Sequence, residues 1–494
     1  ELYKSFVNNN FHSLESKNSI LTLCYSGACE KFDGQQFTPV FQSTSMKQVF
    51  YDEEGFWWAA DDIKGIASDH GSINGSISPN GPFSNELTKI NYVNGQITVS
   101  SGGFLPLSGA LGRSDGVYIY DEGQWFNYNS SKGLNYPKDI MNFFYNPVDQ
   151  KTSLISFGQG MYNLEQDYFL SRRTSTTFGS NAKLTDALSF WGKNLWITQF
   201  DTAYSLHHLA ENGLWETKDL ISPNANFPME IKGLNQQLWI RIAPEKGGGI
   251  IVFDPSTGAE RYLTDVDNNG NLPSQNVWAM APDKEGIMWV GTDNGVCFFY
   301  PINPNNTENV NAQIPYYEYR PLLRGVKILS IKVDAGNRKW FGTNKGLWLF
   351  SSDGEELLYQ FNTQNSPLVS DNITSLEIDP KTGELFVGTD RGIVSFRTEA
   401  VSPENRLSKI TIFPNPVSPE YTGNVGFTGF TQETNVKITD IAGQLIWEGI
   451  SVGGGLSWDR RNLQGDEVST GVYLVFAVSQ NEQEVLVGKI AVVR

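Results

Sequence analysis

The chain has 494 residues, of which 18% are charged and 39% hydrophobic, a normal composition for a globular protein with a sizeable core. Its formal net charge is −17, which argues against nucleic acid as the main partner and means that any anionic ligand needs a local basic patch. Aromatic residues make up 13% of the chain and glycine occurs 48 times, a composition that favours an all-β protein with many turns. No run of 18 apolar residues occurs, so the sequence predicts no membrane-spanning helix.

Residues 1–77 contain two blade-like units. The first is weak and covers Ile20–Tyr25 and Glu30–Phe32, whereas the second, Gln48–Ile66, carries Trp58 where later repeats also carry tryptophan. Two blades cannot close a ring, so we expect them to be the last blades of an incomplete N-terminal propeller, with more chain upstream. The alternative is a single ring of nine blades, above the usual range of about four to eight.

Three cysteines occur in the chain. Cys24 and Cys29 either pair across a hairpin or remain two small buried thiols, and both interpretations stay open. Cys297 lies in a predicted repeat strand and is expected in the core.

A seven-bladed propeller is predicted over residues 78–397. In its clearest unit, Val277–Tyr300, three apolar runs are separated by two tight polar turns, a pattern typical of three consecutive antiparallel strands. The unit returns at Ile328–Phe350 and Ile373–Phe396, and self-similarity at about 40–50 residues is typical of propellers, whose sheets cover one another's faces. Seven strand markers place the expected blades: Ile97–Ser100, Leu154–Phe157, Trp196–Thr198, Leu238–Ile240, Trp289–Gly291, Trp340–Gly342 and Phe386–Gly388.

The composition changes after the last repeat. Residues 398–409 are polar and are interpreted as a linker. Residues 410–494 contain no propeller repeat, but they show short alternating strands at regular spacing, which predicts a small C-terminal β-sandwich.

Two segments resemble known families. The pattern D-x-x-G-x-x-W-V-G-T-x-x-G-V, preceded by L-P-S-x-N at Leu272–Asn276, resembles the two-component-regulator propeller repeat; the residues that carry it are Asp283, Gly286, Trp289, Gly291, Thr292 and Gly295. The last 85 or so residues resemble the type A sorting domain of the type IX secretion system of Bacteroidetes. The motif residues of that domain are Pro414, Asn415, Pro416, Lys437, Gly443, Gly471, Tyr473 and Lys489.

This combination is similar to cell-surface components of the type IX attachment machinery. The resemblance implies a non-catalytic protein that is exported through the periplasm and lies peripherally on the outer membrane. It also implies binding of anionic lipopolysaccharide and its presentation to a sortase, together with other outer-membrane type IX components as partners. The alternatives are a secreted cargo propeller that binds or cleaves polysaccharide and loses its C-terminal domain on export, and a sensor-like propeller for a surface glycan.

Enzymatic and metal chemistry find little support in the sequence. Only four histidines occur, and no H-E-x-x-H, G-x-S-x-G or G-x-x-x-x-G-K-[ST] motif is present. His207 and His208 are neighbours, so in a strand they point to opposite faces and do not share one metal. Asp265–Gly270 matches the first half of a calcium loop, but Asn276 stands where a bidentate glutamate is needed. We therefore expect no enzyme, no metal site and no cofactor.

The expected binding chemistry is stacking and hydrogen bonding at a mouth of the ring. Candidate ligand contacts in or near loops between blades are Tyr204, Trp215, Arg241 and Lys246, and the pair Arg172 and Arg173 is a candidate phosphate contact. Each of these residue types also occurs commonly in ordinary packing or on the surface. In the C-terminal domain, Lys437, Lys489 and Arg494 are candidate contacts for an acidic partner.

Overall fold

The protein divides into two compact units, Glu1–Gly81 and Pro82–Arg494, in a computed structural model. The described residues are 11–17, 20–25, 27–43, 45–61, 65–71, 76–77, 80–129, 136–164, 170–173, 178–179, 181–306, 308–407, 410–479 and 485–494. Within these ranges the chain is almost entirely strand and turn, with one short 3-10 helix, η3 (Pro244–Lys246). No helix of the described part is long and apolar enough to cross a membrane.

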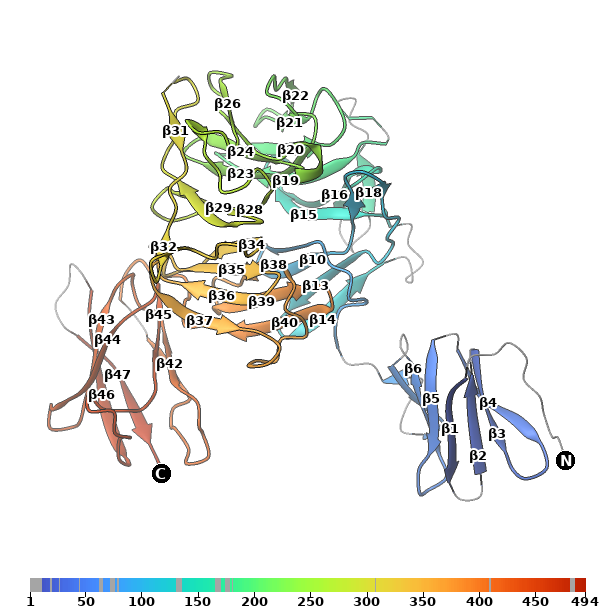
Figure 1. Cartoon of the computed structure of the whole chain (residues 1–494). Coiled ribbons are helices and arrows are strands. Elements are labelled where there is room, and N and C mark those ends of the chain that lie inside the picture. The colour runs from blue at the N-terminus through green and yellow to red at the C-terminus, as the bar shows by residue number, and fades with distance from the viewer. Residues whose placement is uncertain are drawn as a thin grey trace. The chain divides into compact units, whose positions relative to one another are not determined.

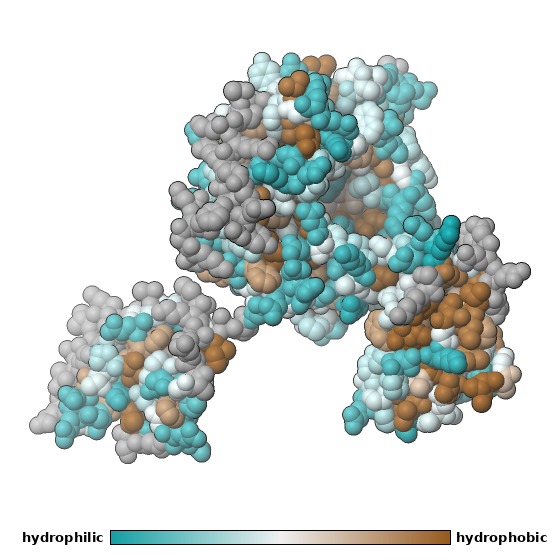
Figure 2. Space-filling view, turned by 180° about the vertical axis from the view of Figure 1, so that it is seen from behind, coloured by the Kyte–Doolittle hydropathy of each residue, from teal (hydrophilic) through white to brown (hydrophobic). Residues whose placement is uncertain are grey.

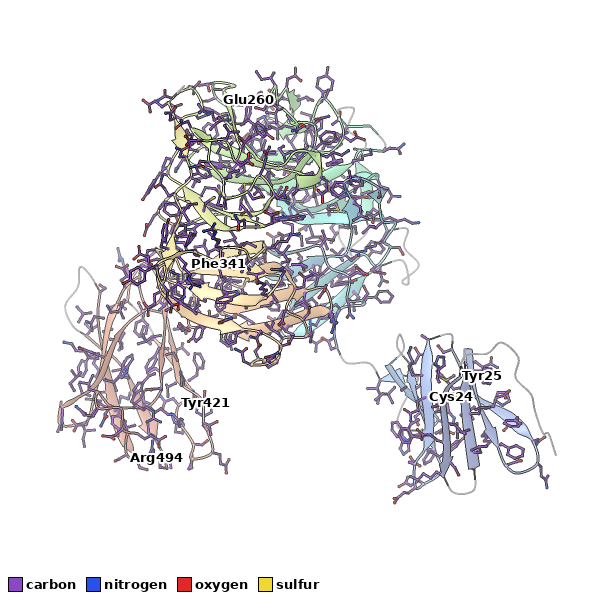
Figure 3. All side chains as sticks on the ribbon, viewed as in Figure 1. Cys24, Tyr25, Glu260, Phe341, Tyr421 and Arg494 are labelled. Atoms are coloured by element: carbon purple, nitrogen blue, oxygen red, sulfur yellow. A yellow bond between two sulfur atoms is a disulfide. The ribbon has the colours of Figure 1, made fainter. Side chains whose placement is uncertain are left out.

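The N-terminal unit contains two four-stranded antiparallel sheets, which correspond to the two predicted blade-like units. Their strands are β1 (Phe11–Lys17), β2 (Ile20–Tyr25), β3 (Gly27–Phe32) and β4 (Phe37–Ser43), then β5 (Met46–Tyr51), β6 (Trp57–Asp61), β7 (Gly65–Ser68) and β8 (Ser76–Ile77). Cys24 and Cys29 stand opposite each other on β2 and β3 and form a disulfide (Figure 3). The structure thus selects the hairpin disulfide from the two interpretations left open by the sequence.

The second unit begins with a ring of sheets, each built from consecutive antiparallel strands (Figure 1). The first four sheets are β9 (Lys89–Val93), β10 (Gln96–Ser100), β13 (Val117–Asp121), β14 (Gln124–Tyr128); β15 (Ile140–Asn146), β16 (Lys151–Ser156), β17 (Gly160–Leu164), β18 (Leu170–Arg173); β19 (Leu184–Ser189), β20 (Leu195–Gln199), β21 (Leu206–Leu209), β22 (Trp215–Lys218); and β23 (Pro228–Leu234), β24 (Gln237–Ile242), β25 (Ile250–Phe253), β26 (Glu260–Leu263). The next three are β28 (Val277–Pro282), β29 (Met288–Thr292), β30 (Gly295–Phe299); β34 (Ile328–Val333), β35 (Lys339–Thr343), β36 (Gly346–Phe350), β37 (Leu357–Phe361); and β38 (Ile373–Ile378), β39 (Glu384–Thr389), β40 (Gly392–Arg397). Short pairs outside these sheets are β11 (Phe104–Leu105) with β12 (Gly109–Ala110), β27 (Asn269–Gly270) with β31 (Val310–Asn311), and β32 (Tyr316–Tyr317) with β33 (Arg320–Pro321).

The first strand of every sheet contacts the first strand of the next, from β9 through β15, β19, β23, β28 and β34 to β38. β38 in turn contacts β9, so the sheets of the described chain close a ring. Every predicted strand marker overlaps the second strand of a sheet, which confirms the all-β propeller that the repeats predicted.

The glycine of each Gly-Thr pair sits where the next sheet approaches. A Cβ atom on Gly291 would lie 2.6 Å from the Ile328 side chain, and one on Gly342 would lie 2.7 Å from Ile373. A Cβ atom on Gly388 would lie 2.7 Å from Leu87, just before the first strand of the ring. Interiors are packed too closely to accept an added carbon at such distances without a shift. The repeat therefore carries glycine to let neighbouring blades meet, and the same contact closes the ring.

The aspartate and threonine of the repeat satisfy the backbone of its two turns. Asp283 accepts the N–H groups of Glu285 and Ile287, both at 2.9 Å, and its second oxygen accepts the indole N–H of Trp289 at 3.0 Å. Thr292 accepts the N–H of Asn294 at 3.0 Å. Side chains that bond to the backbone a few residues on stabilise tight turns, which explains why Asp, Trp and Thr recur at fixed spacing.

Residues 410–494 form a sandwich of two antiparallel sheets around its own core, as predicted. One sheet has the order β41 (Thr411–Phe413), β42 (Val425–Thr428), β45 (Gly455–Trp458), and the other has the order β44 (Leu445–Ile450), β43 (Asn435–Thr439), β46 (Gly471–Val478), β47 (Val485–Val492). Figure 2 shows apolar side chains gathered on one side of this domain. The exposed apolar residues of the domain include Ile450 and Leu486.

Candidate ligand-binding channel

The inner strands of the ring surround a cavity of about 220 Å³. Apolar residues such as Met280 share its wall with charged side chains from six strands, five of which are the first strand of a sheet. The charged residues of this set, which we call the channel cluster, are Lys89, Asp186, Glu230, Lys232, Arg241, Lys332 and Glu377. Four cations stand against three carboxylates, so the cluster is net positive by one charge in a chain of net charge −17.

Asp186 on β19 ties several blades together. Its Oδ1 atom lies 2.5 Å from Lys89 Nζ and accepts the Asn142 amide at 2.6 Å, while Oδ2 accepts the Ile231 N–H at 3.1 Å. Those partners come from β9, β15 and β23, so one buried carboxylate connects strands of four sheets. Hydrogen bonds to a charged acceptor are stronger than neutral ones, so these contacts stabilise the packing of the four sheets around the channel.

Glu230 lies between two cations. Its carboxylate is 3.1 Å from Lys232 Nζ and 3.3 Å from Arg241 Nε. Burial raises the pKa of Glu230, but the charges of Lys232 and Arg241 outweigh burial and hold that pKa below its ordinary value. Burial likewise lowers the pKa of Lys232, but Glu230 and Asp186 outweigh it and raise that pKa. Glu230 and Lys232 are therefore both charged at neutral pH.

Lys332 on β34 pairs with Glu377 on β38 across two adjacent sheets. The Lys332 side chain is 32% exposed, compared with 11% for its partner, so the cation is the more accessible half of the pair. Hydroxyl groups of Ser330 and Ser375 lie in the same wall, and no histidine or cysteine lines this cavity among the described residues. The chemistry on offer is ionic and hydrogen-bonding recognition of a small anionic group.

The sequence candidates are distributed over several places. Arg241 is in the channel cluster, where it also donates to the Val277 carbonyl at 3.4 Å. Lys246 in η3 lies over the ring of Phe227, with Nζ 5.0 Å from its centre. Trp215 on the outer strand β22 packs edge-on against Phe178 within a blade core.

Of the remaining candidates, Tyr204 is not among the residues that line the channel. Tyr204 is 58% exposed in the loop after β20. Arg172 and Arg173 belong to β18, the outermost strand of its sheet, and their side chains lie outside the described residues. Sequence reasoning missed the other members of the channel cluster. The available signal was a charged residue inside the apolar first strand of several repeats, such as Lys332 in ILSIKV and Glu377 in ITSLEI.

The histidine pair behaves as an ordinary strand pair. His207 bonds Gln199 at 2.9 Å and lies edge-on to Phe178, whereas His208 bonds Asn194 at 2.8 Å and stacks on Trp196. The rings thus point to opposite faces of β21, as the alternation of a strand dictates. Burial lowers the pKa of His207 to about 4.

The sorting-motif residues hold the sandwich together. Asn415, between Pro414 and Pro416, donates to the Lys489 carbonyl at 2.7 Å and accepts the Ala491 N–H at 3.1 Å, so it pins the edge of β47. Four other motif residues are placed as follows: Tyr473 is buried and donates to the Ser469 carbonyl at 2.8 Å, Gly443 occupies a turn at φ +86°, Gly471 begins β46, and Lys437 lies on β43. These contacts give the motif a structural role. Arg494, a candidate contact for an acidic partner, forms an ion pair with Glu467 at 2.8 Å.

Comparison with known proteins identifies two family segments. The two component regulator propeller family matches residues 271–294, and the secretion system C-terminal sorting domain family matches residues 411–492. Among curated proteins, histidine kinase P4 of Formosa agariphila is 25% identical over 356 residues, which are 59% of this chain. The chain spans only 25% of the length of that kinase.

Solved structures extend the comparison to the whole chain. PorZ of Porphyromonas gingivalis, described as an essential bacterial surface component of the type IX secretion system, matches with a TM-score of 0.70 and 24% identity over 98% of this chain and 70% of PorZ. The extracellular domain of a one-component system of Bacteroides thetaiotaomicron matches with a TM-score of 0.47 and 15% identity over 99% of this chain and 70% of that domain. The chain therefore has the fold of PorZ, with a two-component-regulator repeat in its ring and a secretion-system sorting domain in residues 411–492.

Proposed function

We propose that this protein is a non-catalytic cell-surface component of the type IX attachment machinery that binds anionic lipopolysaccharide and presents it to a sortase. The observation that carries the proposal is the pairing of a PorZ-like fold over 98% of the chain with a matched sorting domain. On this proposal the protein reaches the surface through the periplasm, lies peripherally on the outer membrane, and keeps residues 410–494 after export.

The channel cluster supports the choice of an anionic ligand. It supplies a local basic patch in a chain of net charge −17, and Lys332 is the most exposed of its four cations. The strength of a charge–charge contact falls with added salt, since the screening length is about 8 Å at physiological ionic strength. Binding at the channel should therefore weaken as salt is raised.

Two opposite charge changes in one ion pair test the proposal. Lys332→Met lowers the charge of the cluster by one, and Glu377→Gln raises it by one, while both break the same pair. We expect purified anionic lipopolysaccharide to bind the first variant more weakly and the second more tightly than the wild type. Lys345→Met is the matched control, because Lys345 is exposed on the turn between β35 and β36 of the sheet that carries Lys332.

The result that would overturn the proposal is equally definite. If lipopolysaccharide does not bind the wild-type chain, it is not the ligand. If the two opposite variants bind it with equal affinity, the channel is not its binding site. A capture assay with the sortase tests the presenting step separately. The wild-type chain should capture the sortase when lipopolysaccharide is present and should not capture it when lipopolysaccharide is omitted.

A further inference from the structure

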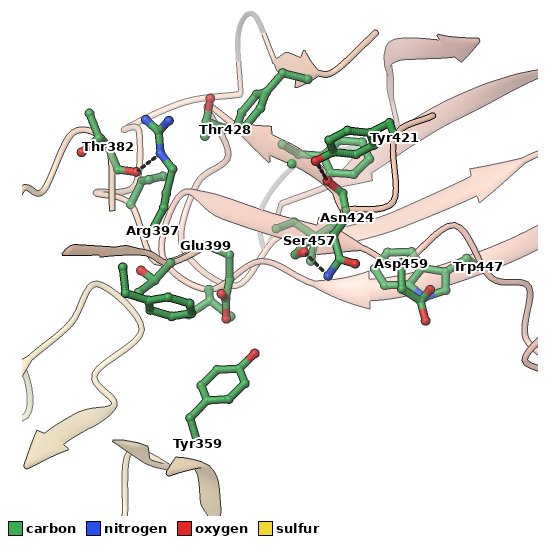
Figure 4. A pocket seen from close by; sticks show the side chains of 18 residues that line it. Tyr359, Thr382, Arg397, Glu399, Tyr421, Asn424, Thr428, Trp447, Ser457 and Asp459 are labelled. Atoms are coloured by element: carbon green, nitrogen blue, oxygen red, sulfur yellow. Dashed lines mark hydrogen bonds between the residues drawn. The ribbon is translucent and has the colours of Figure 1, made fainter. Parts of the chain in front are cut away.

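A hollow lies where the last two sheets of the ring meet the sandwich. It has a volume of about 630 Å³. Its walls come from β37, the turn before β39, β40 and the following segment on one side, and from the sandwich on the other (Figure 4). We call it the junction groove. Pockets that bind small molecules and sugars commonly have volumes of about 300–1,000 Å³ and form between structural modules.

The two walls of the groove are fixed to each other. The segment after the ring pairs with the sandwich through Val401, whose carbonyl accepts the Gly454 N–H at 2.7 Å. A Cβ atom on Gly455 of the sandwich would lie 1.9 Å from the Glu399 carbonyl, and one on Gly336 of the ring would lie 2.3 Å from the Val452 side chain. Contacts this tight accept no side chain, so the groove is preformed rather than assembled by a ligand.

Exposed aromatic rings stand on both walls. Tyr359 and Phe396 of the ring are 42% and 37% exposed, and Phe413 of the sandwich is 41% exposed. Phe413 lies against Gly426, and Trp447 lies against Gly449, where a Cβ atom would be 2.7 Å and 2.3 Å from the respective rings. The tips of both rings therefore lie over strand positions that carry no side chain, and both rings line the groove. Aromatic rings suit the C–H-bearing surface of a sugar.

Polar groups sit beside these rings. Asn424 donates to Ser457 Oγ at 3.0 Å, and Tyr421 donates to the Asn424 carbonyl at 2.8 Å, so amide, hydroxyl and phenol are held in place together (Figure 4). Arg397 donates through Nε to the Thr382 carbonyl at 3.3 Å, which positions the rest of its guanidinium at the groove. Asp459 supplies an acceptor on the sandwich side.

The charge of the groove differs from that of the channel. Its charged lining residues are Arg397, Glu399 and Asp459. Both carboxylates have an arginine partner outside the lining, since Glu399 lies 2.6 Å from Arg338 and Asp459 lies 3.9 Å from Arg461. The lining therefore offers a single cation to a phosphate or uronate, whereas the hydroxyl groups of a neutral sugar can both donate to a carboxylate and accept from the guanidinium.

We propose that the junction groove binds a neutral oligosaccharide, with Tyr359, Phe413 and Trp447 as stacking surfaces. Arg397, Asn424 and Asp459 bond its hydroxyl groups. This site is separate from the anionic site of the channel and does not depend on it. Because one wall belongs to residues 410–494, the sandwich acts as half of a binding site in addition to carrying the sorting motif.

The test titrates the full chain with mannohexaose, maltohexaose and cellohexaose, and with hexagalacturonate as the anionic counterpart. We expect saturable binding of at least one neutral hexasaccharide by calorimetry, and weaker binding of the uronate. Tyr359→Ala and Asp459→Asn should each lower the affinity for the neutral hexasaccharide at least tenfold. Asp459→Asn keeps the shape of the side chain, so it reports recognition rather than folding. Tyr319→Ala is the control, because Tyr319 is fully exposed outside the groove.

Three results would overturn this proposal. They are no binding of any neutral hexasaccharide, unchanged affinity in both groove variants, and uronate binding that is tighter than that of every neutral ligand and is weakened by the groove variants and not by Lys332→Met. Lipopolysaccharide titrations of the Lys332→Met variant report on the channel alone, so failure of one site is distinguishable from failure of the other.

Discussion

Replacing Lys339 with methionine removes the positive half of an ion pair that joins two blades of the ring. Lys339 on β35 and Asp283 at the end of β28 are fully buried, with Nζ 3.1 Å from Oδ2. The ammonium group also lies 4.8 Å from the centre of the Trp289 ring and donates to the Ser352 carbonyl. Lys339 therefore contacts both Asp283 and Trp289 of the repeat, and it links their blade to the next one.

The expected cost follows from what Asp283 retains. Breaking a buried pair by removing one partner costs about 3–5 kcal/mol, because an uncompensated charge stays in the interior. Burial raises the pKa of Asp283, but the Ile287 N–H, the Trp289 N–H and Lys339 outweigh burial and lower it. Two of these donors, with the Glu285 N–H, remain after Lys339→Met, so we expect the low end of that range, about 3 kcal/mol. Adding Asp283→Asn removes the stranded charge and should recover part of the loss.

Hydrogen exchange of the backbone amides of β28–β29 and β34–β35 measures this change locally. A loss of about 3 kcal/mol accelerates exchange through local opening by about a hundredfold, since each 1.4 kcal/mol is a factor of ten. Lys345→Met should leave these rates nearly unchanged. The reasoning would be refuted if Lys339→Met changed the exchange rates by less than about threefold. It would also be refuted if the double variant lost as much stability as the two single variants together.

Two further predictions concern stability. His207 is neutral in the fold because burial lowers its pKa to about 4, whereas the unfolded chain protonates it near 6.5, so stability should fall as the pH drops from about 6.5 to about 4, by up to about 3 kcal/mol. His207→Gln should make the thermal midpoint depend less on pH over that range, and His12→Gln should leave the pH dependence unchanged. An unchanged pH dependence in His207→Gln would contradict the assignment. A Cβ atom on Gly342 would lie 2.2 Å from Ser330 Oγ, so Gly342→Ala should cost about 1–3 kcal/mol and lower the thermal midpoint. Gly179→Ala, where nothing lies within 4 Å, is its control; equal midpoints would show that the ring accommodates the methyl group.

Much of the ring could be predicted because its signals are local. The Asp283-to-Trp289 spacing, the glycine at Gly291 and the hydroxyl at Thr292 each act within one hairpin or against the next one, so a single repeat contains the reason for its own sequence. The same holds for Asn415 and Tyr473 in the sandwich, whose motif positions make backbone contacts within the domain.

The channel cluster and the junction groove depend on contacts that no local pattern contains. Lys332 and Glu377 meet only because two blades lie side by side, and the N–H of Ile90 bonds Ser375 across 285 positions of sequence to close the ring. Stacking candidates such as Trp215 were selected by residue type, and the fold uses that ring for packing. Aromatic residues that do face a hollow, such as Phe413, sit in a motif whose sequence gives no indication of the second wall.

The most direct test of the central claim is the intact mass of the protein recovered from the cell surface. A surface component of the attachment machinery keeps the sandwich, so the account predicts a mass that includes residues 410–494 and no covalently attached glycolipid. A chain that ends near Pro403 and carries a glycolipid would identify cargo instead, and would contradict both the proposed function and a groove built from two domains.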